Sequence, residues 1–372
     1  MKAKTGKTIR IPGTKKSLNK DEVFVIAEIG KNFIDSKRDE SVDVYIENAK
    51  QLITAAKEAG VDAVKFQTHE VEDEQLDVKV VSPHFDGADR YSWVKKNTDA
   101  TPPRFWQEIK SHADKEGIIF FSTPMSRKAA EKLQALDMPL WKVGSGDVQD
   151  YRMLDFQIET KKPIIISSGM VSLAELDRVI EHLKSKHASF AVLYCVSQYP
   201  CPREAFNLGT IEYLKEKYPN LIIGFSDHSV GDDTVMLAAV KLGARIIEKH
   251  FSFSRKLWGS DHKVSMTPDE MKKMVGKIRD GSYKNVDERL FYGEKHKELE
   301  GAENKFRPYF NKALVAGRDI KRGDVVTKEA LYSMRPLMHI KGERADRFYD
   351  IVGKCAKRNL KKFEPIKARD FE

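Results

Sequence analysis

The chain has 372 residues, of which 41% are hydrophobic and 33% charged, a composition typical of a globular protein. It contains no apolar run near the roughly 18 residues that a membrane span needs, and its basic N-terminus lacks the apolar stretch of a secretory signal. Cys195, Cys201 and Cys355 show no CxxC spacing, which argues against a disulfide scaffold or a cysteine-based zinc site and predicts a cytoplasmic protein.

The net charge of +9 is unevenly distributed along the chain. Residues 1–20 carry seven Lys or Arg and no acid, and residues 305–372 carry eighteen basic against nine acidic side chains. The remaining residues, 21–304, hold 40 basic and 47 acidic side chains. Because no base-reading motif accompanies the basic ends, we expect no nucleic-acid partner. We expect residues 1–22 to form a basic, disordered, solvated tail.

Eight short apolar runs alternate with amphipathic segments between residues 23 and 290. The runs are rich in β-branched and aromatic residues, as strands covered on both faces are. They lie at residues 23–29, 63–66, 118–121, 140–143, 163–167, 190–195, 221–226 and 245–251. The segment 41–60 is typical of the intervening helices, with Ser41 as N-cap and Gly60 as stop signal. Eight such units predict an α/β fold, a (β/α)8 TIM barrel over 23–290.

A doubly wound open sheet is the structural alternative, but no GxGxxG follows the first predicted strand.

After residue 290 the alternation of apolar runs and amphipathic segments ends. Residues 291–304 are polar and are interpreted as a linker. Residues 305–372 hold short strand-like runs separated by turns, which predicts a small, basic, β-rich domain.

Two histidines follow neighbouring predicted strands, His228 after the seventh and His250 after the eighth. The active site of a TIM barrel lies at the C-terminal ends of its strands, so the two imidazoles can share one divalent ion. Imidazole suits manganese, with zinc or cobalt able to substitute. With only two protein ligands, positions stay open for substrate, as in a catalytic metal site. Separate structural roles for the two histidines are the alternative.

A second group at the strand ends suits an anion. It consists of Lys65, Lys142, Ser145, Ser167 and Ser226. Ammonium and hydroxyl groups in a partly dry pocket bind phosphate or carboxylate, and nearby glycines let backbone amides approach the same anion. The alternative is that each lysine pairs with an acid at a strand end or keeps its ammonium in water. These residues predict a metal-assisted barrel enzyme for an anionic substrate and leave the reaction class open.

The same strand ends carry strings that resemble the sialic acid synthase family, the phosphoenolpyruvate-dependent synthases of nine-carbon sugar acids. The strings occur in family order: AEIGKN (27–32), KFQTH (65–69), FFSTPMSR (120–127), WKVGSGD (141–147), IIISSGM (164–170), YPCP (199–202), GFSDHS (224–229), EKHF (248–251) and GSDHKVSMTPDE (259–270). Near the C-terminus, ALVAGRDIKRGDVV and IVGKCAKRNLKKFEPI resemble the antifreeze-like (SAF) domain that ends these enzymes.

The resemblance implies a TIM barrel followed by a SAF domain, assembled as a domain-swapped homodimer. It also implies that phosphoenolpyruvate condenses with an N-acetylated hexosamine, typically N-acetylmannosamine, and that phosphate leaves by C–O cleavage. N-acetylmannosamine 6-phosphate and the diacetamido-trideoxyhexose precursors of legionaminic and pseudaminic acids are alternative acceptors. Another metal-dependent barrel aldolase or epimerase is a more distant alternative, and a catalytically silent ice- or glycan-binding protein is a third.

The resemblance also assigns roles to single residues. Glu28 would be the acid/base group near C3 and the aldehyde oxygen. His228 and His250 would hold manganese, or else cobalt or magnesium, which would polarise the aldehyde and position the water that attacks C2. The phosphoenolpyruvate-binding residues would be Lys65, Thr123, Lys142, Ser145, Ser167, Ser197 and Ser226. The sugar-binding residues would be Gln67, Asp147, Tyr199, Asp261, Phe310 and Arg335, of which Phe310 and Arg335 would come from the partner's SAF domain.

Several positions depart from the usual family pattern. Asp147 stands in place of a Glu, Ser197 in place of an Asn, Phe33 in place of a His and Ser260 in place of a Pro. Because several of these positions lie on the sugar side, the departures bear on which acceptor is used.

Overall fold

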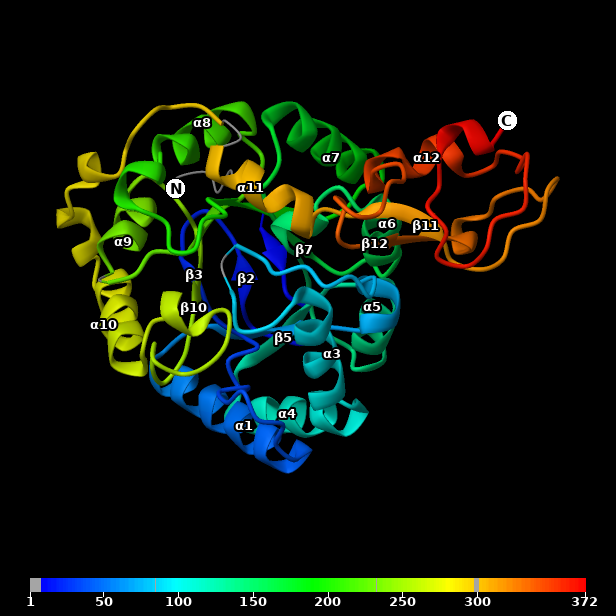
Figure 1. Cartoon of the computed structure of the whole chain (residues 1–372). Coiled ribbons are helices and arrows are strands. Elements are labelled where there is room, and N and C mark those ends of the chain that lie inside the picture. The colour runs from blue at the N-terminus through cyan, green and yellow to red at the C-terminus, as the bar shows by residue number, and fades with distance from the viewer. Residues whose placement is uncertain (1–7, 84, 232, 298–300) are drawn as a thin grey trace.

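The computed structural model describes residues 8–83, 85–231, 233–297 and 301–372, and a barrel of eight parallel strands forms its centre (Figure 1). The barrel strands are β3 (Phe24–Gly30), β4 (Ala63–Thr68), β5 (Ile119–Pro124), β6 (Trp141–Val143), β7 (Ile164–Ser167), β8 (Phe190–Cys195), β9 (Ile223–Asp227) and β10 (Ile246–His250). Their order is β5-β4-β3-β10-β9-β8-β7-β6, with β5 and β6 in contact at the seam. Each of the eight predicted apolar runs therefore corresponds to one strand, and the predicted (β/α)8 barrel is confirmed.

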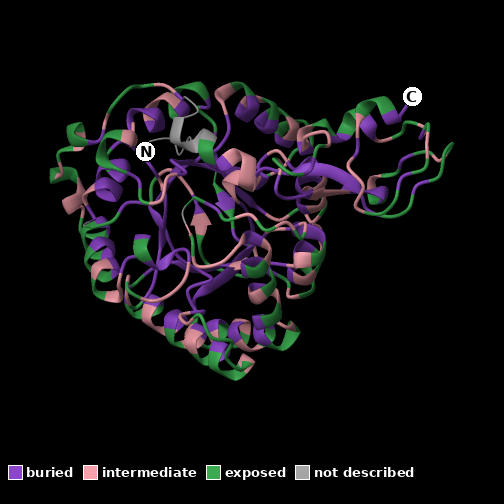
Figure 2. Ribbon diagram, viewed as in Figure 1, coloured by how far each residue is buried: buried purple, intermediate pink, exposed green. Residues whose placement is uncertain are grey.

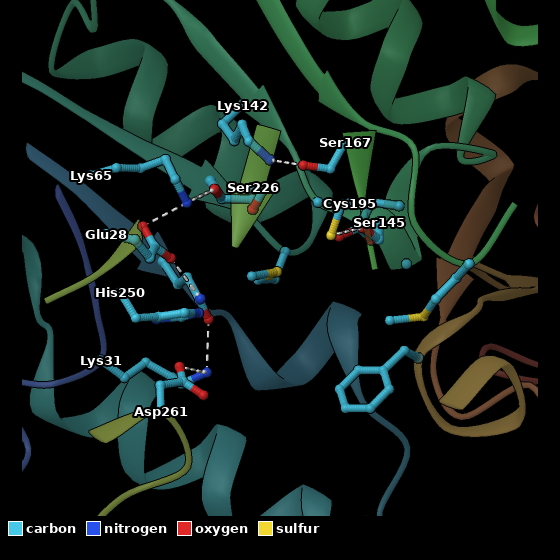
Figure 3. A pocket seen from close by; sticks show the side chains of 18 of the residues that line it. Glu28, Lys31, Lys65, Lys142, Ser145, Ser167, Cys195, Ser226, His250 and Asp261 are labelled. Atoms are coloured by element: carbon cyan, nitrogen blue, oxygen red, sulfur yellow. Dashed lines mark hydrogen bonds and ion pairs between the residues drawn. The ribbon is translucent and has the colours of Figure 1, made fainter. Parts of the chain in front are cut away.

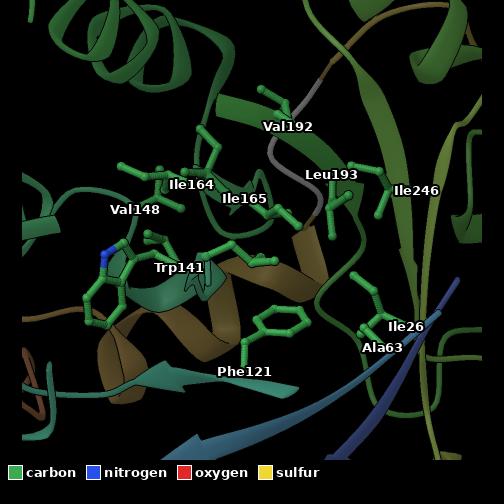
Figure 4. Close-up of a cluster of buried hydrophobic side chains, with 14 of the residues drawn as sticks. Ile26, Ala63, Phe121, Trp141, Val148, Ile164, Ile165, Val192, Leu193 and Ile246 are labelled. Carbon is green, nitrogen blue, oxygen red and sulfur yellow. The ribbon is translucent and has the colours of Figure 1, made fainter. Parts of the chain in front are cut away.

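The strands are buried on both faces because successive side chains alternate between the barrel interior and the surrounding helices. Figure 4 shows part of this core, where Ile26, Ala63, Ile165, Leu193 and Ile246 from five different strands gather. All five are fully buried. This explains why the apolar runs are nearly continuous in the sequence instead of alternating with polar residues.

Helices cover the outside of the barrel, with buried residues on their inner faces and exposed residues outside (Figure 2). They are α1 (Val42–Glu58), α2 (Val71–Glu74), α3 (Arg90–Ala100), α4 (Pro103–Glu116), α5 (Arg127–Ala135), α6 (Tyr151–Glu159), α7 (Leu173–Ser185), α8 (Gly209–Lys217), α9 (Thr234–Lys241) and α10 (Pro268–Arg279). Their starts follow ordinary capping chemistry: the Ser41 side chain accepts from the Val44 amide at α1. Ser172 and Glu175 form a capping box at α7.

The long connection between β4 and α4 folds back over the barrel and carries α2 and α3. It is anchored by Trp93 of α3, which is buried against Phe85 and Trp258 with ring centroids 5.1 and 5.2 Å apart. Asp89 caps α3 by accepting from the Ser92 amide. This anchoring holds Arg90, the first residue of α3, at the mouth of the barrel.

The N-terminal segment is not a disordered tail in the part that the structure describes, so that prediction is wrong from residue 8 onwards. A short hairpin of β1 (Ile9–Arg10) and β2 (Ser17–Leu18) buries Ile11 and neighbouring apolar side chains in the barrel core. Lys16 forms an ion pair with Asp62, just before β4, with Nζ and Oδ1 2.8 Å apart. The hairpin therefore covers the end of the barrel opposite the strand C-termini. The first seven residues lie outside the described part.

The C-terminal region is a small β-rich domain built on the antiparallel pair β11 (Ala313–Ala316) and β12 (Leu331–Met334), with the short helix α12 (Phe348–Ile351). Helix α11 (Gly301–Phe310) precedes it and passes across the barrel mouth (Figure 1). The helix begins inside the segment predicted to be a linker. Among the described residues, no helix is both long and apolar enough to cross a bilayer.

Candidate active site

A pocket lies at the C-terminal ends of the barrel strands, beneath α11 and the C-terminal domain. It gathers the predicted site residues from eight strands and two domains. Those that line it are Glu28, Lys65, Gln67, Thr123, Lys142, Ser145, Asp147, Ser167, Tyr199, Ser226, His228, His250, Asp261, Phe310 and Arg335. The predicted residues thus form one site, although their separate roles stay predictions.

Ser197 is the predicted site residue that the structure does not place in the pocket wall. It is fully buried behind Gly169, where a Cβ atom would lie 2.3 Å from the Ser197 Oγ and 2.5 Å from the Ser145 Oγ. Only glycine fits at this point, so Gly169 lets the two hydroxyls approach one another. Contact between Ser197 and phosphoenolpyruvate stays a prediction.

Acidic and basic side chains alternate along one wall of the pocket, as Figure 3 shows from Glu28 through Lys65 to Lys142. The Lys65 Nζ lies 2.6 Å from the Glu28 Oε2 and 3.7 Å from the Glu248 Oε2. The Lys142 Nζ lies 3.8 Å from the Glu248 Oε1. We call Glu28, Lys65, Glu248 and Lys142 the charged row. The row pairs two amino groups with two carboxyl groups, and all four side chains are buried.

Hydroxyl groups complete the hydrogen bonds of the charged row. Lys65 donates to the Thr123 Oγ1 at 3.1 Å, and Lys142 donates to the Ser167 Oγ at 2.6 Å. The Ser226 hydroxyl donates to the Glu248 Oε1 at 3.0 Å. The row therefore offers ammonium and hydroxyl donors close together, which is the arrangement that binds phosphate or carboxylate groups.

Burial raises the pKa of Glu28 above its usual range, and the nearby Glu248 adds to this, although Lys65 opposes it. Burial alone would lower the pKa of Lys65, but Glu248 and Glu28 raise it overall. Burial lowers the pKa of Lys142. A raised pKa favours the protonated form of the Glu28 carboxyl, which suits a group that exchanges a proton with a substrate atom.

The two histidines lie on the same wall, with ring centroids 5.6 Å apart. The Nδ1 of His228 is 2.9 Å from the Val196 carbonyl oxygen, so this nitrogen carries the proton and Nε2 keeps its lone pair. Burial lowers the pKa of His250 to about 3, which keeps its ring neutral, and its buried Nδ1 has no hydrogen-bond partner. Burial alone would lower the pKa of His228, but Cys195 and the hydrogen bond to the Val196 carbonyl raise it overall. Two imidazoles side by side fit a divalent cation, which binds the ring nitrogen in place of a proton.

The described residues contain no cluster of three or more His, Cys, Asp or Glu side chains that could hold a metal by themselves. A cation on His228 and His250 would therefore keep several positions for other ligands. Tyr199 packs on the His228 ring with centroids 4.0 Å apart and limits the movement of that imidazole.

Beyond the histidines, polar side chains form the part of the pocket predicted to hold the sugar. Gln67 donates to the Glu28 Oε1 at 2.8 Å and accepts from the Lys31 Nζ at 2.7 Å. The Lys31 Nζ also lies 3.3 Å from the Asp261 Oδ2, and Figure 3 shows Lys31 and Asp261 close together. These contacts connect the predicted acid/base group to the acceptor side of the pocket.

Phe310 and Arg335 line the pocket within this single chain, and their contribution from a partner's domain stays a prediction. Arg335 donates from Nη2 to the Asp147 Oδ1 at 2.5 Å and from Nε to the Phe310 carbonyl oxygen at 2.6 Å. Its Nη1 lies 3.4 Å from the Glu74 Oε1. The chain can make these contacts because α11 leads across the barrel mouth before the C-terminal domain begins.

Comparison with known proteins identifies the family. The NeuB family model matches residues 52–287, and the SAF domain model matches residues 311–372. The chain belongs to the NeuB family. The resemblance noted in the sequence motifs is thereby confirmed, and the small β-rich domain of this NeuB-family chain is its SAF domain.

Relatives of this NeuB-family chain are similar over nearly its whole length. The pseudaminic acid synthase of Campylobacter jejuni is 32% identical over 94% of this chain and 97% of its own. The N-acetylneuraminate-9-phosphate synthase of Drosophila melanogaster is 30% identical over 93% and 95%. The crystal structure of the spore coat polysaccharide biosynthesis protein SpsE of Bacillus subtilis matches with a TM-score of 0.79 at 28% identity, over 98% and 99%. Like the synthases among these relatives, the chain is an enzyme.

The pocket of this NeuB-family enzyme also contains residues that the sequence did not single out as site residues. They are Lys31, His69, Glu74, Arg90, Met125, Gly144, Gly146, Met170, Cys195 and Glu248. Glu248 could have been found, because it lies two residues before His250 on one strand and so shares its face. The intervening Lys249 points the other way, where its ammonium lies 2.5 Å from the Asp227 carboxylate. Arg90 gave no sequence signal, because its connection has no regular pattern.

Proposed function

We propose that this NeuB-family enzyme condenses phosphoenolpyruvate with an N-acetylated hexosamine to form a nine-carbon sugar acid and releases phosphate by C–O cleavage. The charged row beside the two histidines carries this proposal. It combines a donor-rich site for a small polyanion with a carboxyl group, Glu28, whose pKa is raised. Two of the relatives are synthases of sugar acids, which agrees with such a product.

Phosphoenolpyruvate would bind with its phosphate and carboxylate among Lys65, Lys142 and the surrounding hydroxyls. Both ammonium groups are buried, so their attraction for an anion is weakly screened by water. The hydroxyls of Ser167 and Thr123 already accept from these lysines and can rotate their own protons toward substrate oxygens.

The proposed reaction joins C3 of phosphoenolpyruvate to the aldehyde carbon of the open-chain sugar. The aldehyde oxygen takes up a proton from Glu28, and a water oxygen adds at C2. The water gives up both protons, one to reprotonate Glu28 and one to the phosphate, which leaves with its bridging oxygen as C2 becomes the ketone. Glu28 is placed to supply the proton, since burial favours its protonated form and Gln67 fixes one of its oxygens. Lys65, paired with Glu28 at 2.6 Å, stabilises the carboxylate after the transfer.

His228 and His250 would hold the divalent cation, for which we propose manganese, with cobalt or magnesium as alternatives. When bound, the cation would supply Lewis acidity toward the sugar aldehyde. The protein's own contribution is the arrangement of the ligands. The Val196 carbonyl selects the His228 tautomer, and Tyr199 packs against that ring.

N-acetylmannosamine is the acceptor that we propose first, and its 6-phosphate and the diacetamido-trideoxyhexoses are the alternatives. The relatives differ in this respect, since one is named for a 9-phosphorylated product and another for pseudaminic acid. The homodimer and the cytoplasmic location stay predictions.

The test is phosphate release from phosphoenolpyruvate with manganese and a panel of N-acetylated sugars. We expect release that depends on the sugar and is lost in the His228→Ala variant. Absence of sugar-dependent release with every acceptor, from a folded and manganese-loaded protein, would contradict the proposed function.

A further inference from the structure

Arg90 is a buried cation whose side chain has no hydrogen-bond partner in the described structure. It lies at the start of α3 and lines the pocket, yet it is only 6% exposed. Its Nε is buried without a partner, and no carboxylate among the described residues comes within ion-pair distance of its guanidinium. The guanidinium carbon lies 4.6 Å from the centroid of the Phe310 ring, so the aromatic ring supports the group from one side.

A buried guanidinium without hydrogen bonds destabilises the fold unless a ligand completes its contacts. Burial of a charge without hydrogen bonds carries a large desolvation penalty, which a partner with several acceptor oxygens offsets. Burial lowers the pKa of Arg90 to about 10, so the guanidinium is still charged at neutral pH. Its donors lie in a rigid planar fork, which matches the oxygen spacing of phosphate and carboxylate.

The other pocket cations on the acceptor side already have partners. Arg335 contacts Asp147, Glu74 and the Phe310 carbonyl oxygen. Lys31 contacts Gln67 and Asp261. In the described part of this side of the pocket, Arg90 is therefore the cation whose side chain has no hydrogen-bond partner.

Arg90 also lies apart from the charged row. The charged groups that act most strongly on it are Glu74, Arg335, Asp261 and Asp147, and no member of the row is among them. Arg90 therefore belongs to the acceptor side of the pocket, next to Phe310.

We propose that Arg90 is a specificity-determining residue of the acceptor site and binds a phosphate ester of the acceptor sugar. The inference rests on the proposed function and narrows its acceptor to the phosphorylated class. A neutral hydroxyl or acetamido oxygen would satisfy one or two donors, whereas a phosphate can accept from the whole fork and also neutralises the charge.

The test compares N-acetylmannosamine 6-phosphate with N-acetylmannosamine as acceptors for the wild type, Arg90→Met and Arg90→Lys. In the wild type we expect a lower KM for the phosphorylated sugar. Loss of charge-assisted hydrogen bonds in Arg90→Met should raise that KM by roughly 10- to 100-fold. The KM for the neutral sugar should change much less, so that the preference for the phosphorylated sugar is lost. Arg90→Lys should retain part of the preference, because it keeps a charge but loses the fork.

Lys95→Met is the matched control, because it removes one positive charge from the same helix at an exposed position. It should change none of these constants.

Calorimetric titration of the sugar phosphate into wild type and Arg90→Met measures binding without turnover, and thermal unfolding checks that the variant is folded. A wild type that prefers the neutral sugar, or an Arg90→Met variant that affects both sugars equally or binds the sugar phosphate normally, would overturn the inference. Absence of phosphate release with every acceptor would instead contradict the proposed function, and the titration would still decide the role of Arg90.

Discussion

Arg335 of the SAF domain donates to Asp147 of the barrel, with Nη2 and Oδ1 2.5 Å apart. Both side chains are almost fully buried, and Asp147 also pairs with Lys312 at 2.8 Å. The carboxylate is therefore shared by two cations of the C-terminal region, and all of these contacts occur within one chain. The same Asp147 lines the pocket, so the position of the SAF domain and the shape of the acceptor side depend on one another.

Complementation separates an Arg335 that acts in its own chain, as in this contact, from the domain swap that the family resemblance implies. If Arg335 acts in its own chain, Glu28→Gln and Arg335→Ala, each inactive, will not rescue one another when they are mixed, unfolded and re-assembled. Every active-site pocket in the mixture would then lack either Glu28 or Arg335. The activity of the mixture, measured against each parent treated alone, checks this. Activity well above both parents would show that SAF domains are exchanged between two chains, as the family resemblance implied.

Glu28→Gln should lose most turnover and keep its affinity for phosphoenolpyruvate. The amide can still accept from Gln67 but cannot carry the proton, and loss of one acid/base group typically lowers kcat by about 10²- to 10⁴-fold. Steady-state kinetics and calorimetric titration of phosphoenolpyruvate measure the two effects. Glu22→Gln, at an exposed position shortly before the same strand, is the control. Near-normal turnover in Glu28→Gln would assign the proton transfer to another group.

Removal of either imidazole should abolish both metal binding and activity. His228→Ala or His250→Ala leaves one protein ligand for the cation, so we expect less than one bound manganese per chain after dialysis, with the fold retained. Metal content by elemental analysis and far-UV circular dichroism check this. His339→Ala, at an exposed position, should bind metal like the wild type. Full activity in a chelator-treated, metal-free sample would contradict a metal role for the pair.

The barrel could be predicted from sequence because its strands are buried on both faces and so appear as apolar runs, as β7 (Ile164–Ser167) does. Strand ends such as Glu28 and His250 could be placed because the TIM barrel gathers them at one rim. Arg90 could not be placed in the site from the sequence, since it comes from an irregular connection whose path depends on the packing of Trp93 and Phe85.

The N-terminal hairpin was missed for a different reason. Its lysines suggested a solvated segment, but β2 carries the fully buried Leu18, and Lys16 is neutralised by Asp62. Charge counted along the sequence does not show which ion pairs form.

Acid should weaken the attachment of the SAF domain to the barrel, because of Glu175 on α7. Its carboxylate accepts from Arg307 at 2.7 Å and from Arg344 at 2.7 Å, which are residues of α11 and of the SAF domain. Burial alone would raise the pKa of Glu175, but these hydrogen bonds lower it to about 2. A folded-state pKa below the unfolded value contributes stability that is fully present above about pH 5 and is lost as the pH falls toward 2. The loss of stability is on the order of a few kcal/mol.

Thermal unfolding from pH 6 to pH 2.5 should show a falling Tm in the wild type. Glu175→Gln should have a lower Tm at pH 6 and a shallower decline, because the amide does not titrate but still accepts from the Ser172 amide. Glu181→Gln, exposed on the same helix, should follow the wild type. Equal slopes for wild type and Glu175→Gln would show that this carboxylate does not hold the domains together.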